Sequence, residues 1–210
     1  MPSMEFPSRF FVTGTDTGVG KTLVSAILMT GRKAAYWKPV QSGLETMTDT
    51  AWVQQMTGFS DHLFVPETYR LSQALSPHAA AVEDGVSISL SAFQLPDQDR
   101  YPRLIVEGAG GVMAPLNEKH FMVDLMKYLA LPVLLVARSG LGTINHTLLS
   151  LEKLRNRGLD VFGVVMNGPK NRINKQAIET YGGIRVTAEV ETLSHIDGRS
   201  LAEAYAQYFR

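Results

Sequence analysis

The strongest constraint on the fold is a glycine-rich turn between a short apolar run and an amphipathic stretch. The apolar run covers residues 10–12, and the turn Gly-Thr-Asp-Thr-Gly-Val-Gly-Lys-Thr occupies residues 14–22. Apolar side chains then recur at helical spacing, which predicts a helix over residues 20–31 that ends at Gly31. A strand, a glycine-rich turn and a helix in this order are typical of a phosphate-binding loop, because free N–H groups at the helix start converge on anionic oxygens.

Two residues of the turn suit a nucleoside triphosphate. Lys21 supplies a mobile positive charge, and the Thr22 hydroxyl can ligate a Mg²⁺ ion that bridges phosphate oxygens. Five residues separate Gly14 from Gly20, one more than in the usual motif, and Thr15 stands where a glycine is common. The alternative is a glycine turn that caps a helix by chance, and the buried strand just before it argues against this. We therefore expect ATP and Mg²⁺ to bind here.

Further apolar runs alternate with helical stretches along the chain. Strands are predicted at residues 34–37, 104–106, 132–136 and 161–166, and helices at 50–56 and 143–157. This alternation predicts a single α/β domain over residues 1–210, with a doubly wound, mainly parallel sheet of the P-loop NTPase type. Between residues 49 and 99 the pattern is weaker, and loops with short helices are expected around residues 76–78.

Charged residues occupy the carboxyl ends of two predicted strands, where ligands of such sheets bind. Lys38 ends the strand at 34–37, and we expect it to face the same crevice as Lys21 and to stabilise charge on a transferring phosphoryl group. A rim lysine that reaches solvent is the alternative. Glu107 precedes three glycines within four residues, which would leave its carboxylate facing the phosphates as a metal ligand. A strand-end acid in solvent is the alternative.

Two nearby polar residues are weaker candidates when taken alone. Asp49 follows the segment 38–43 and would usually be a helix N-cap. Ser42 could donate a hydrogen bond to a substrate, although a serine in this setting is more often a turn residue.

Composition excludes several classes of function. The 20 basic and 20 acidic residues balance, so no net field attracts nucleic acid or an anionic membrane. The chain has no cysteine, which excludes disulfides, thiolate metal sites and cysteine nucleophiles. Residues 1–9 lack the pattern of a secretory signal, and the apolar run at 129–137 is too short to span a membrane. A cytoplasmic protein that acts on small molecules is expected.

Five segments, in their order and spacing, resemble the dethiobiotin synthetase family. They lie at residues 14–22, 38–43 (Lys-Pro-Val-Gln-Ser-Gly), 76–78 (Ser-Pro-His), 106–111 (Val-Glu-Gly-Ala-Gly-Gly) and 141–146 (Leu-Gly-Thr-Ile-Asn-His). The resemblance implies that 7,8-diaminononanoate, CO2 and ATP give dethiobiotin, ADP and phosphate with Mg²⁺. A carbamate of one substrate amine would take the γ-phosphoryl group, and the second amine would attack this mixed anhydride to close the cyclic urea.

For the nucleotide, the resemblance implies contacts from two loops and two strand ends. The residues are Gly18, Val19, Gly20, Lys21, Thr22, Leu23, Asp49, Glu107, Gly108, Ala109, Gly110 and Asn167. Among them, Thr22, Asp49 and Glu107 would surround Mg²⁺, and Asn167 would contact the base. Lys38 and Lys21 would be the catalytic lysines, with Lys38 stabilising the carbamate and the transferred phosphoryl group.

For the diamine, the resemblance implies contacts with Thr17 and Ser42. The carboxylate at the far end of the substrate would bind the start of a helix formed by Gly142, Thr143, Ile144 and Asn145. In the family this helix comes from the neighbouring subunit, which implies a homodimer with the substrate site at the subunit interface.

The sequence departs from the family at two places. Gly18 stands where many members carry an acidic residue, and residues 184–191 lack the Gly-x-Ile-Pro segment that helps to enclose the base. The second departure predicts loose selectivity for ATP over other nucleoside triphosphates.

Three other functions compete with this one. A partitioning or regulatory ATPase of the deviant P-loop class would carry a lysine where this chain has Asp16. A non-catalytic nucleotide-binding domain would make substitution of Lys38 inconsequential. An amidotransferase-type enzyme would need a cysteine, which the chain lacks.

Overall fold

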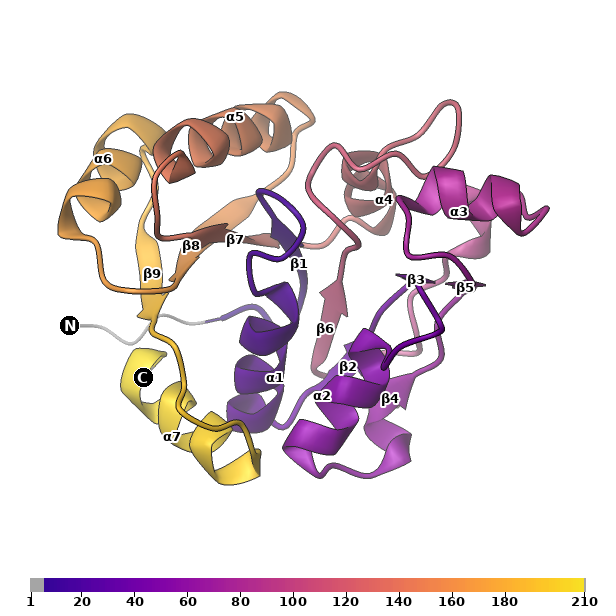
Figure 1. Cartoon of the computed structure of the whole chain (residues 1–210), viewed down its shortest axis with the longest axis horizontal. Helices are drawn as coiled ribbons and strands as arrows, with labels where there is room; N and C mark the ends of the chain where they lie inside the picture. The colour runs from indigo at the N-terminus through magenta and orange to yellow at the C-terminus, as the bar shows by residue number, and fades with distance from the viewer. Residues whose placement is uncertain (1–5, 210) are drawn as a thin grey trace.

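Parallel strands form the central sheet of the computed structural model, which describes residues 6–209 (Figure 1). Within that range the sheet has seven strands in the order β4-β2-β6-β1-β7-β8-β9. They are β1 (Arg9–Gly14), β2 (Ala35–Trp37), β4 (Phe64–Val65), β6 (Leu104–Glu107), β7 (Val133–Arg138), β8 (Val161–Asn167) and β9 (Val186–Val190). Most of the N-terminal segment expected to lack a signal lies outside the described residues, as do both ends of the domain predicted over 1–210.

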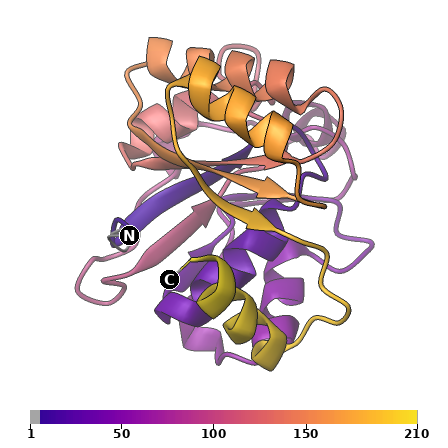
Figure 2. The ribbon, with the colours of Figure 1, turned by 90° about the vertical axis from the view of Figure 1, so that its left-hand side faces the viewer.

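Helices cover both faces of this sheet (Figures 1 and 2). One face carries α1 (Lys21–Arg32), α2 (Asp49–Thr57) and α7 (Gly198–Tyr208), and the other carries α4 (Met122–Leu129), α5 (Thr143–Asn156) and α6 (Arg172–Gly182). The doubly wound parallel fold predicted from the sequence is thus confirmed. None of the described helices combines the length and apolarity needed to cross a bilayer.

Successive side chains of the buried strands point to opposite faces of the sheet, so each face has its own apolar core. In β1, Phe10 and Val12 pack with α1, whereas Phe11 packs in the cluster that includes residues of α4 and α5. All three side chains are fully buried. Because β1 is covered on both faces, its apolar run shows no alternation in the sequence.

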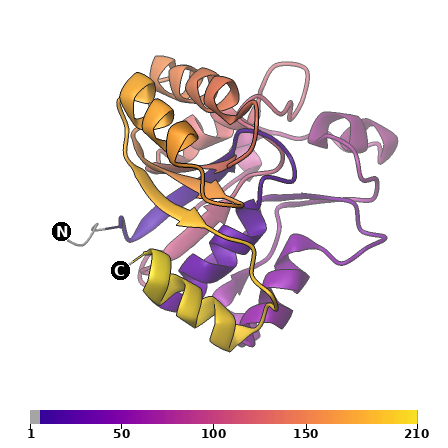
Figure 3. The ribbon, with the colours of Figure 1, turned by 60° about the vertical axis from the view of Figure 1, so that its left-hand side comes forward.

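A small second sheet lies at the rim of the fold (Figure 1), and a short helix projects beside it (Figures 1 and 3). Strands β3 (Val40–Ser42) and β5 (Tyr69–Leu71) pair in parallel, and α3 (Pro77–Glu83) packs against both. The 3-10 turn η2 (Leu90–Ala92) packs in the same cluster as this sheet and helix, whereas η1 (Asp61–Leu63) packs in the cluster that includes α1 and α2. The sequence predicted only loops and short helices here, because strands of two or three residues leave little periodic signal.

The predicted end of α1 at Gly31 is wrong. The helix continues to Arg32, and Lys33 ends it in the left-handed conformation with φ 50°. At Gly31 an added Cβ would lie 1.9 Å from Cγ of Tyr205 in α7. This glycine therefore lets two helices approach closely, which is a packing role that sequence spacing cannot distinguish from a C-terminal stop.

The N-cap of α2 also differs from the sequence-based alternative. Thr48 caps the helix, because its hydroxyl accepts a hydrogen bond from the Ala51 N–H at 3.2 Å. Asp49 is the first residue inside the helix. Its carboxylate is therefore not needed as a cap and can turn towards the centre of the molecule.

Candidate active site

Two glycines with positive φ shape the phosphate-binding loop. Gly18 has φ 72°, and Gly20, which caps α1, has φ 96°. A side chain at Gly20 would also clash, since its Cβ would lie 2.2 Å from Asn167 Nδ2. Such a backbone turns successive N–H groups towards one point and forms a concavity that binds anions. Together with the start of α1, the loop offers a site for phosphate groups.

Lys21 lies inside this loop rather than in solvent. It is 7% exposed, and its Nζ donates a hydrogen bond to the Asp16 carbonyl at 3.0 Å. Burial, followed by repulsion from nearby Lys38, lowers the pKa of Lys21 to about 8. The carboxylate of Asp16 pairs with Arg138 at 2.7 Å. Asp16 thus helps to order the loop at the position where the rival class of ATPase carries a lysine.

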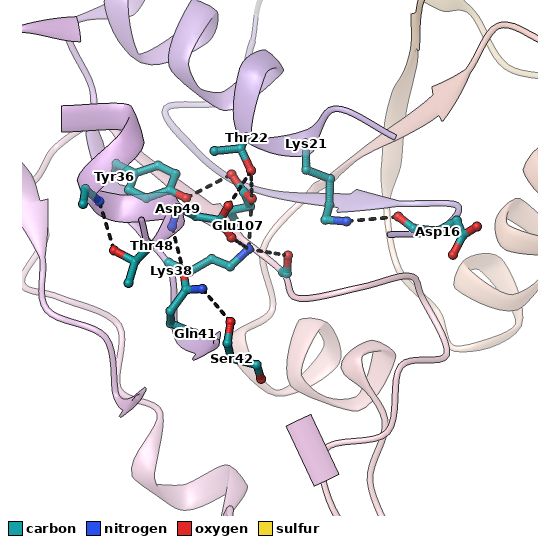
Figure 4. A network of polar contacts seen from close by, with 12 residues as sticks. Asp16, Lys21, Thr22, Tyr36, Lys38, Gln41, Ser42, Thr48, Asp49 and Glu107 are labelled. Atoms are coloured by element: carbon teal, nitrogen blue, oxygen red, sulfur yellow. Dashed lines mark hydrogen bonds and ion pairs between the residues drawn. The ribbon is translucent and has the colours of Figure 1, made fainter. Parts of the chain in front are cut away.

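Four side chains from separate elements converge beside the loop (Figure 4). The Thr22 hydroxyl lies 3.0 Å from Asp49 Oδ1 and 2.9 Å from Glu107 Oε1. Lys38 Nζ lies 2.6 Å from Asp49 Oδ2 and 3.0 Å from Glu107 Oε1. It also donates to the Gly108 carbonyl at 3.2 Å. The ammonium group is therefore held by two carboxylates and one carbonyl.

The strand ends explain why these residues meet. Glu107 is the last residue of β6, and Lys38 directly follows β2, its neighbour in the sheet. Gln41 holds the start of α2, because its Oε1 accepts a hydrogen bond from the Asp49 N–H at 3.0 Å. Two parallel strand ends and two helix N-termini thus meet at one edge of the sheet, where ligands of this fold class bind.

The charges in this network stabilise one another. Glu107 is fully buried and Lys38 is 4% exposed. Burial opposes the charge on Lys38, but Glu107 and Asp49 outweigh it and raise its pKa. Burial likewise acts against the Asp49 charge, and Lys38 with the Thr22 hydroxyl outweighs it, so the pKa of Asp49 is lowered. Both groups are charged at neutral pH.

The oxygens around Thr22 suit a hard divalent cation. Mg²⁺ prefers carboxylate and hydroxyl oxygens, and here one hydroxyl lies within 3.0 Å of two carboxylates. Thr22 adjoins the phosphate-binding loop, so a cation held there could also contact phosphate oxygens. The residues Thr22, Asp49 and Glu107 therefore fit Mg²⁺ in number and chemistry.

A second glycine loop, residues 108–111, packs directly on the first. An added Cβ at Gly108 would lie 2.8 Å from the Phe11 ring, and one at Gly111 would lie 3.2 Å from the Thr15 carbonyl. The Val112 N–H donates to the Gly14 carbonyl at 3.2 Å. The loops that follow β1 and β6 thus form two walls of one cleft.

This cleft has a volume of about 1050 Å³. Eleven of the predicted site residues line it: Thr17, Gly18, Gly20, Lys21, Thr22, Lys38, Ser42, Asp49, Glu107, Ala109 and Gly110. Val19, Leu23, Gly108 and Asn167 are adjacent in the chain or fold but do not line it. Asn167 ends β8, and its Nδ2 donates to the Val19 carbonyl at 3.1 Å.

The segment predicted to bind the carboxylate of the substrate lies elsewhere on the chain. Gly142 caps α5 with φ 89°, and Thr143, Ile144 and Asn145 form its first turn, as predicted. These four residues do not line the cleft. Leu141 just before them is fully exposed. Within the described chain, this helix start and the cleft are therefore separate.

Other residues of the cleft were missed from the sequence. Thr15, Asp16 and Gln41 also line the cleft, and the motifs that contain them do not by themselves indicate a role for these three side chains. Leu149, Ser150 and Lys153 line the cleft from the middle of α5, where helical periodicity alone predicts ordinary surface or core positions. Tyr36 does not line the cleft, but its hydroxyl donates to Glu107 Oε2 at 3.0 Å. An aromatic residue in a buried strand gives no sequence signal for such a contact.

Comparison with known proteins gives consistent matches. Residues 8–200 match a family model described as an AAA domain. The chain is 50% identical over 192 residues to the ATP-dependent dethiobiotin synthetase BioD of Paramagnetospirillum magneticum, covering 91% of this chain and 92% of that protein. It is 45% identical over 202 residues to BioD of Rhodopseudomonas palustris, with 96% and 94% coverage.

Solved structures show the same fold in more distant proteins. The MinC:MinD cell division protein complex of Aquifex aeolicus matches with a TM-score of 0.56 at 12% identity, covering 93% of this chain and 86% of that chain. At such low identity the likeness concerns the fold alone.

Proposed function

We propose that the cleft closes a cyclic urea through a carbamate and a carbamic–phosphoric anhydride. The chain belongs to the ATP-dependent dethiobiotin synthetase family, whose members are ligases of biotin biosynthesis. The observation that carries this proposal is the network of Thr22, Lys38, Asp49 and Glu107 beside the phosphate-binding loop. It gathers one cation and two carboxylates where a terminal phosphate would lie.

The proposed reaction has three balanced steps. One amine of 7,8-diaminononanoate attacks CO2 and loses a proton, which gives a carbamate. A carbamate oxygen then attacks the γ-phosphorus of ATP and ADP leaves. The second amine attacks the carbamoyl carbon and loses a proton, the C–O bond to phosphate breaks, and the urea ring closes as inorganic phosphate departs with that oxygen.

The chain's residues would serve this reaction mainly by positioning and by neutralising charge. Lys21 and the N–H groups of residues 18–23 would hold the phosphates, and Lys38 would stabilise the carbamate and the transferred phosphoryl group. Thr22, Asp49 and Glu107 would hold Mg²⁺, which when bound supplies further charge neutralisation. Thr17 and Ser42 would contact the diamine. Support for Ser42 comes from its buried hydroxyl, which has no hydrogen-bond partner among the described residues.

Oxygen tracing tests the anhydride. Incubation with ¹⁸O-labelled bicarbonate, 7,8-diaminononanoate and Mg-ATP should transfer one label into inorganic phosphate and leave one in the urea carbonyl. Mass analysis of both products reads this out. Phosphate without label, in a reaction that yields labelled dethiobiotin, would contradict phosphorylation of the carbamate.

We further propose a homodimer in which the start of α5 from one subunit completes the cleft of the other. Support comes from the separation of Gly142 and Asn145 from the cleft of their own chain and from the exposure of Leu141. Mixing two inactive variants, Lys38→Met and Gly142→Asp, tests this. Subunit exchange would give mixed dimers with one intact site, and about a quarter of the wild-type rate should return. No recovery after verified exchange would contradict a shared site.

Two finer points belong to the same proposal. Loose nucleotide selectivity is expected because the Gly-x-Ile-Pro segment is lacking, and residues 186–190 form the edge strand β9 instead. Comparable turnover with ATP, CTP and GTP would agree, and a strict preference for ATP would count against it. Use of ATP in biosynthesis also favours a cytoplasmic location, which fractionation of cells would test.

A further inference from the structure

Tyr36 is a buried tyrosine with no part in the reaction proposed above. Its side chain is fully buried in the cluster below the cleft, and its ring packs edge-on against Phe64 with centroids 6.3 Å apart. A phenol in such a place needs a hydrogen-bond partner, since an unpaired buried hydroxyl is costly. Its partner is Glu107, the fully buried carboxylate of the network.

Strand register brings the two residues together. Tyr36 in β2 pairs with Ile105 in β6, so Glu107 lies two residues further along the neighbouring strand. Side chains two residues apart point to the same face, and diagonal neighbours on adjacent strands are within reach of a long aromatic side chain. Lys38 follows Tyr36 by two residues and lies on that face as well. The Tyr36 hydroxyl therefore reaches Oε2 of Glu107 from the core side of the sheet, and the Lys38 ammonium contacts Oε1 of the same carboxylate.

The two oxygens of Glu107 have different partners. Oε1 accepts hydrogen bonds from the Thr22 hydroxyl at 2.9 Å and from Lys38 Nζ at 3.0 Å. Oε2 accepts one from the Tyr36 hydroxyl at 3.0 Å (Figure 4). Nothing else within the described chain donates to Oε2, so the phenol is the one partner that holds the second oxygen of the carboxylate while Thr22 and Lys38 hold the first.

We propose that Tyr36 is a positioning residue, which holds Oε2 of Glu107 and thereby directs Oε1 towards Thr22 and the cation site. This inference rests on the proposed function, because it assumes that Glu107 ligates Mg²⁺. A residue that forms a hydrogen bond with a metal-ligating side chain fixes the orientation of that side chain. Loss of such a residue typically weakens metal binding or activity about 10- to 100-fold.

The phenol is suited to this task because its ring is fixed in the core and its hydroxyl reaches the carboxylate. A phenylalanine would keep the ring and its packing against Phe64 and remove only the hydrogen bond.

The test compares Tyr36→Phe with Tyr69→Phe. Tyr69 is the matched control, because its hydroxyl also makes one hydrogen bond, which it accepts from the Ser89 N–H at 3.0 Å, and this bond lies outside the network around Glu107. Binding of Mn²⁺ in the presence of a non-hydrolysable ATP analogue is measured by the electron paramagnetic resonance signal of free Mn²⁺. We expect Tyr36→Phe to weaken Mn²⁺ binding about 10- to 100-fold and Tyr69→Phe to leave it unchanged. Wild-type affinity in Tyr36→Phe, or equal losses in both variants, would overturn the proposal.

A double-mutant cycle identifies the route of the effect. In a Glu107→Gln background, Tyr36→Phe should cause little further loss of Mn²⁺ affinity, whereas additive losses would show that Tyr36 acts elsewhere. In steady-state assays, Tyr36→Phe should raise the Mg²⁺ concentration for half-maximal rate and leave KM for the diamine unchanged. If the wild-type protein bound Mn²⁺ but made no dethiobiotin, the proposed function would be refuted. The Mn²⁺ affinities of Tyr36→Phe and Tyr69→Phe would still test the role of Tyr36 in cation binding.

A measurement on the wild-type protein covers the case in which Tyr36→Phe does not fold. With tyrosine labelled at Cζ, the Tyr36 hydroxyl proton should give a slowly exchanging NMR signal that broadens when Mn²⁺ replaces Mg²⁺. A Tyr36 hydroxyl proton that exchanges rapidly with water, or one that Mn²⁺ leaves unbroadened, would overturn the proposal.

Discussion

Replacement of Lys38 by methionine should separate catalysis from cation binding. Methionine keeps most of the aliphatic volume of the side chain and removes the ammonium that Asp49 and Glu107 share at 2.6 and 3.0 Å. The two carboxylates then repel each other without a compensating charge. We expect the variant to be less stable, inactive and a better ligand for Mg²⁺, because the cation no longer competes with the lysine.

The size of the stability loss follows from burial. Removing one partner of a fully buried ion pair costs about 3–5 kcal/mol. The Glu107 side chain is fully buried, but that of Asp49 is 34% exposed and can be solvated, so we expect the lower end, about 3 kcal/mol. For a chain of this size, each kcal/mol shifts Tm by about 2–4 °C, which gives a fall of about 6–12 °C.

Calorimetry with and without Mg²⁺ measures both effects. The Tm of Lys38→Met should fall in the absence of Mg²⁺ and recover more than that of the wild type when Mg²⁺ is added. Lys153→Met is the matched control, since Lys153 lines the same cleft and makes no ion pair within the described chain. A Tm for Lys38→Met within about 2 °C of the wild type without Mg²⁺ would refute the reasoning, because it would mean that the two carboxylates need no counter-charge.

Three further predictions follow from other contacts. The pKa of Lys21 is lowered to about 8 from 10.5, so between these pH values the unfolded chain binds more protons than the folded one, and stability without nucleotide should rise with pH. Because Lys21 loses its charge above about pH 8, the affinity for Mg-ATP measured by calorimetry should fall as pH rises further. An affinity that does not change with pH would contradict this. Gly20→Ala should weaken nucleotide binding about tenfold or more, because its φ of 96° and the contact with Asn167 both disfavour a Cβ, and wild-type affinity in a titration would argue against this loop geometry. Gly31→Ala should lower the free energy of unfolding in urea by about 1–3 kcal/mol, although alanine favours helix, and Tyr205→Ala in the same chain should relieve much of that loss.

Local features of the site could be predicted from the sequence. The phosphate-binding loop is continuous, so its strand, glycines and helix start are visible in residues 10–31. Lys38 and Glu107 were found because parallel strands end at one edge of a sheet, wherever the strands lie in the chain. The roles of these residues remain predictions, whereas the structure brings their side chains together in one network.

Contacts between distant segments could not be predicted. Gly31 has the spacing of a helix stop, and only the approach of Tyr205, 174 residues later, gives it another purpose. Tyr36 resembles any aromatic residue of a buried strand until the register with β6 places it beneath Glu107. The same limit applies to Lys153, whose place in the cleft depends on how α5 packs and not on its neighbours in the sequence.

The central claim is that Lys38 and the carboxylates beside it form the centre that activates a carbamate with ATP. The most direct measurement is mass detection of dethiobiotin after incubation with 7,8-diaminononanoate, bicarbonate and Mg-ATP, for the wild type, Lys38→Met and Lys153→Met. We predict product from the wild type and from Lys153→Met, and none from folded Lys38→Met that still binds Mg-ATP. Wild-type yield from Lys38→Met, or no product from well-folded wild type, would contradict the account.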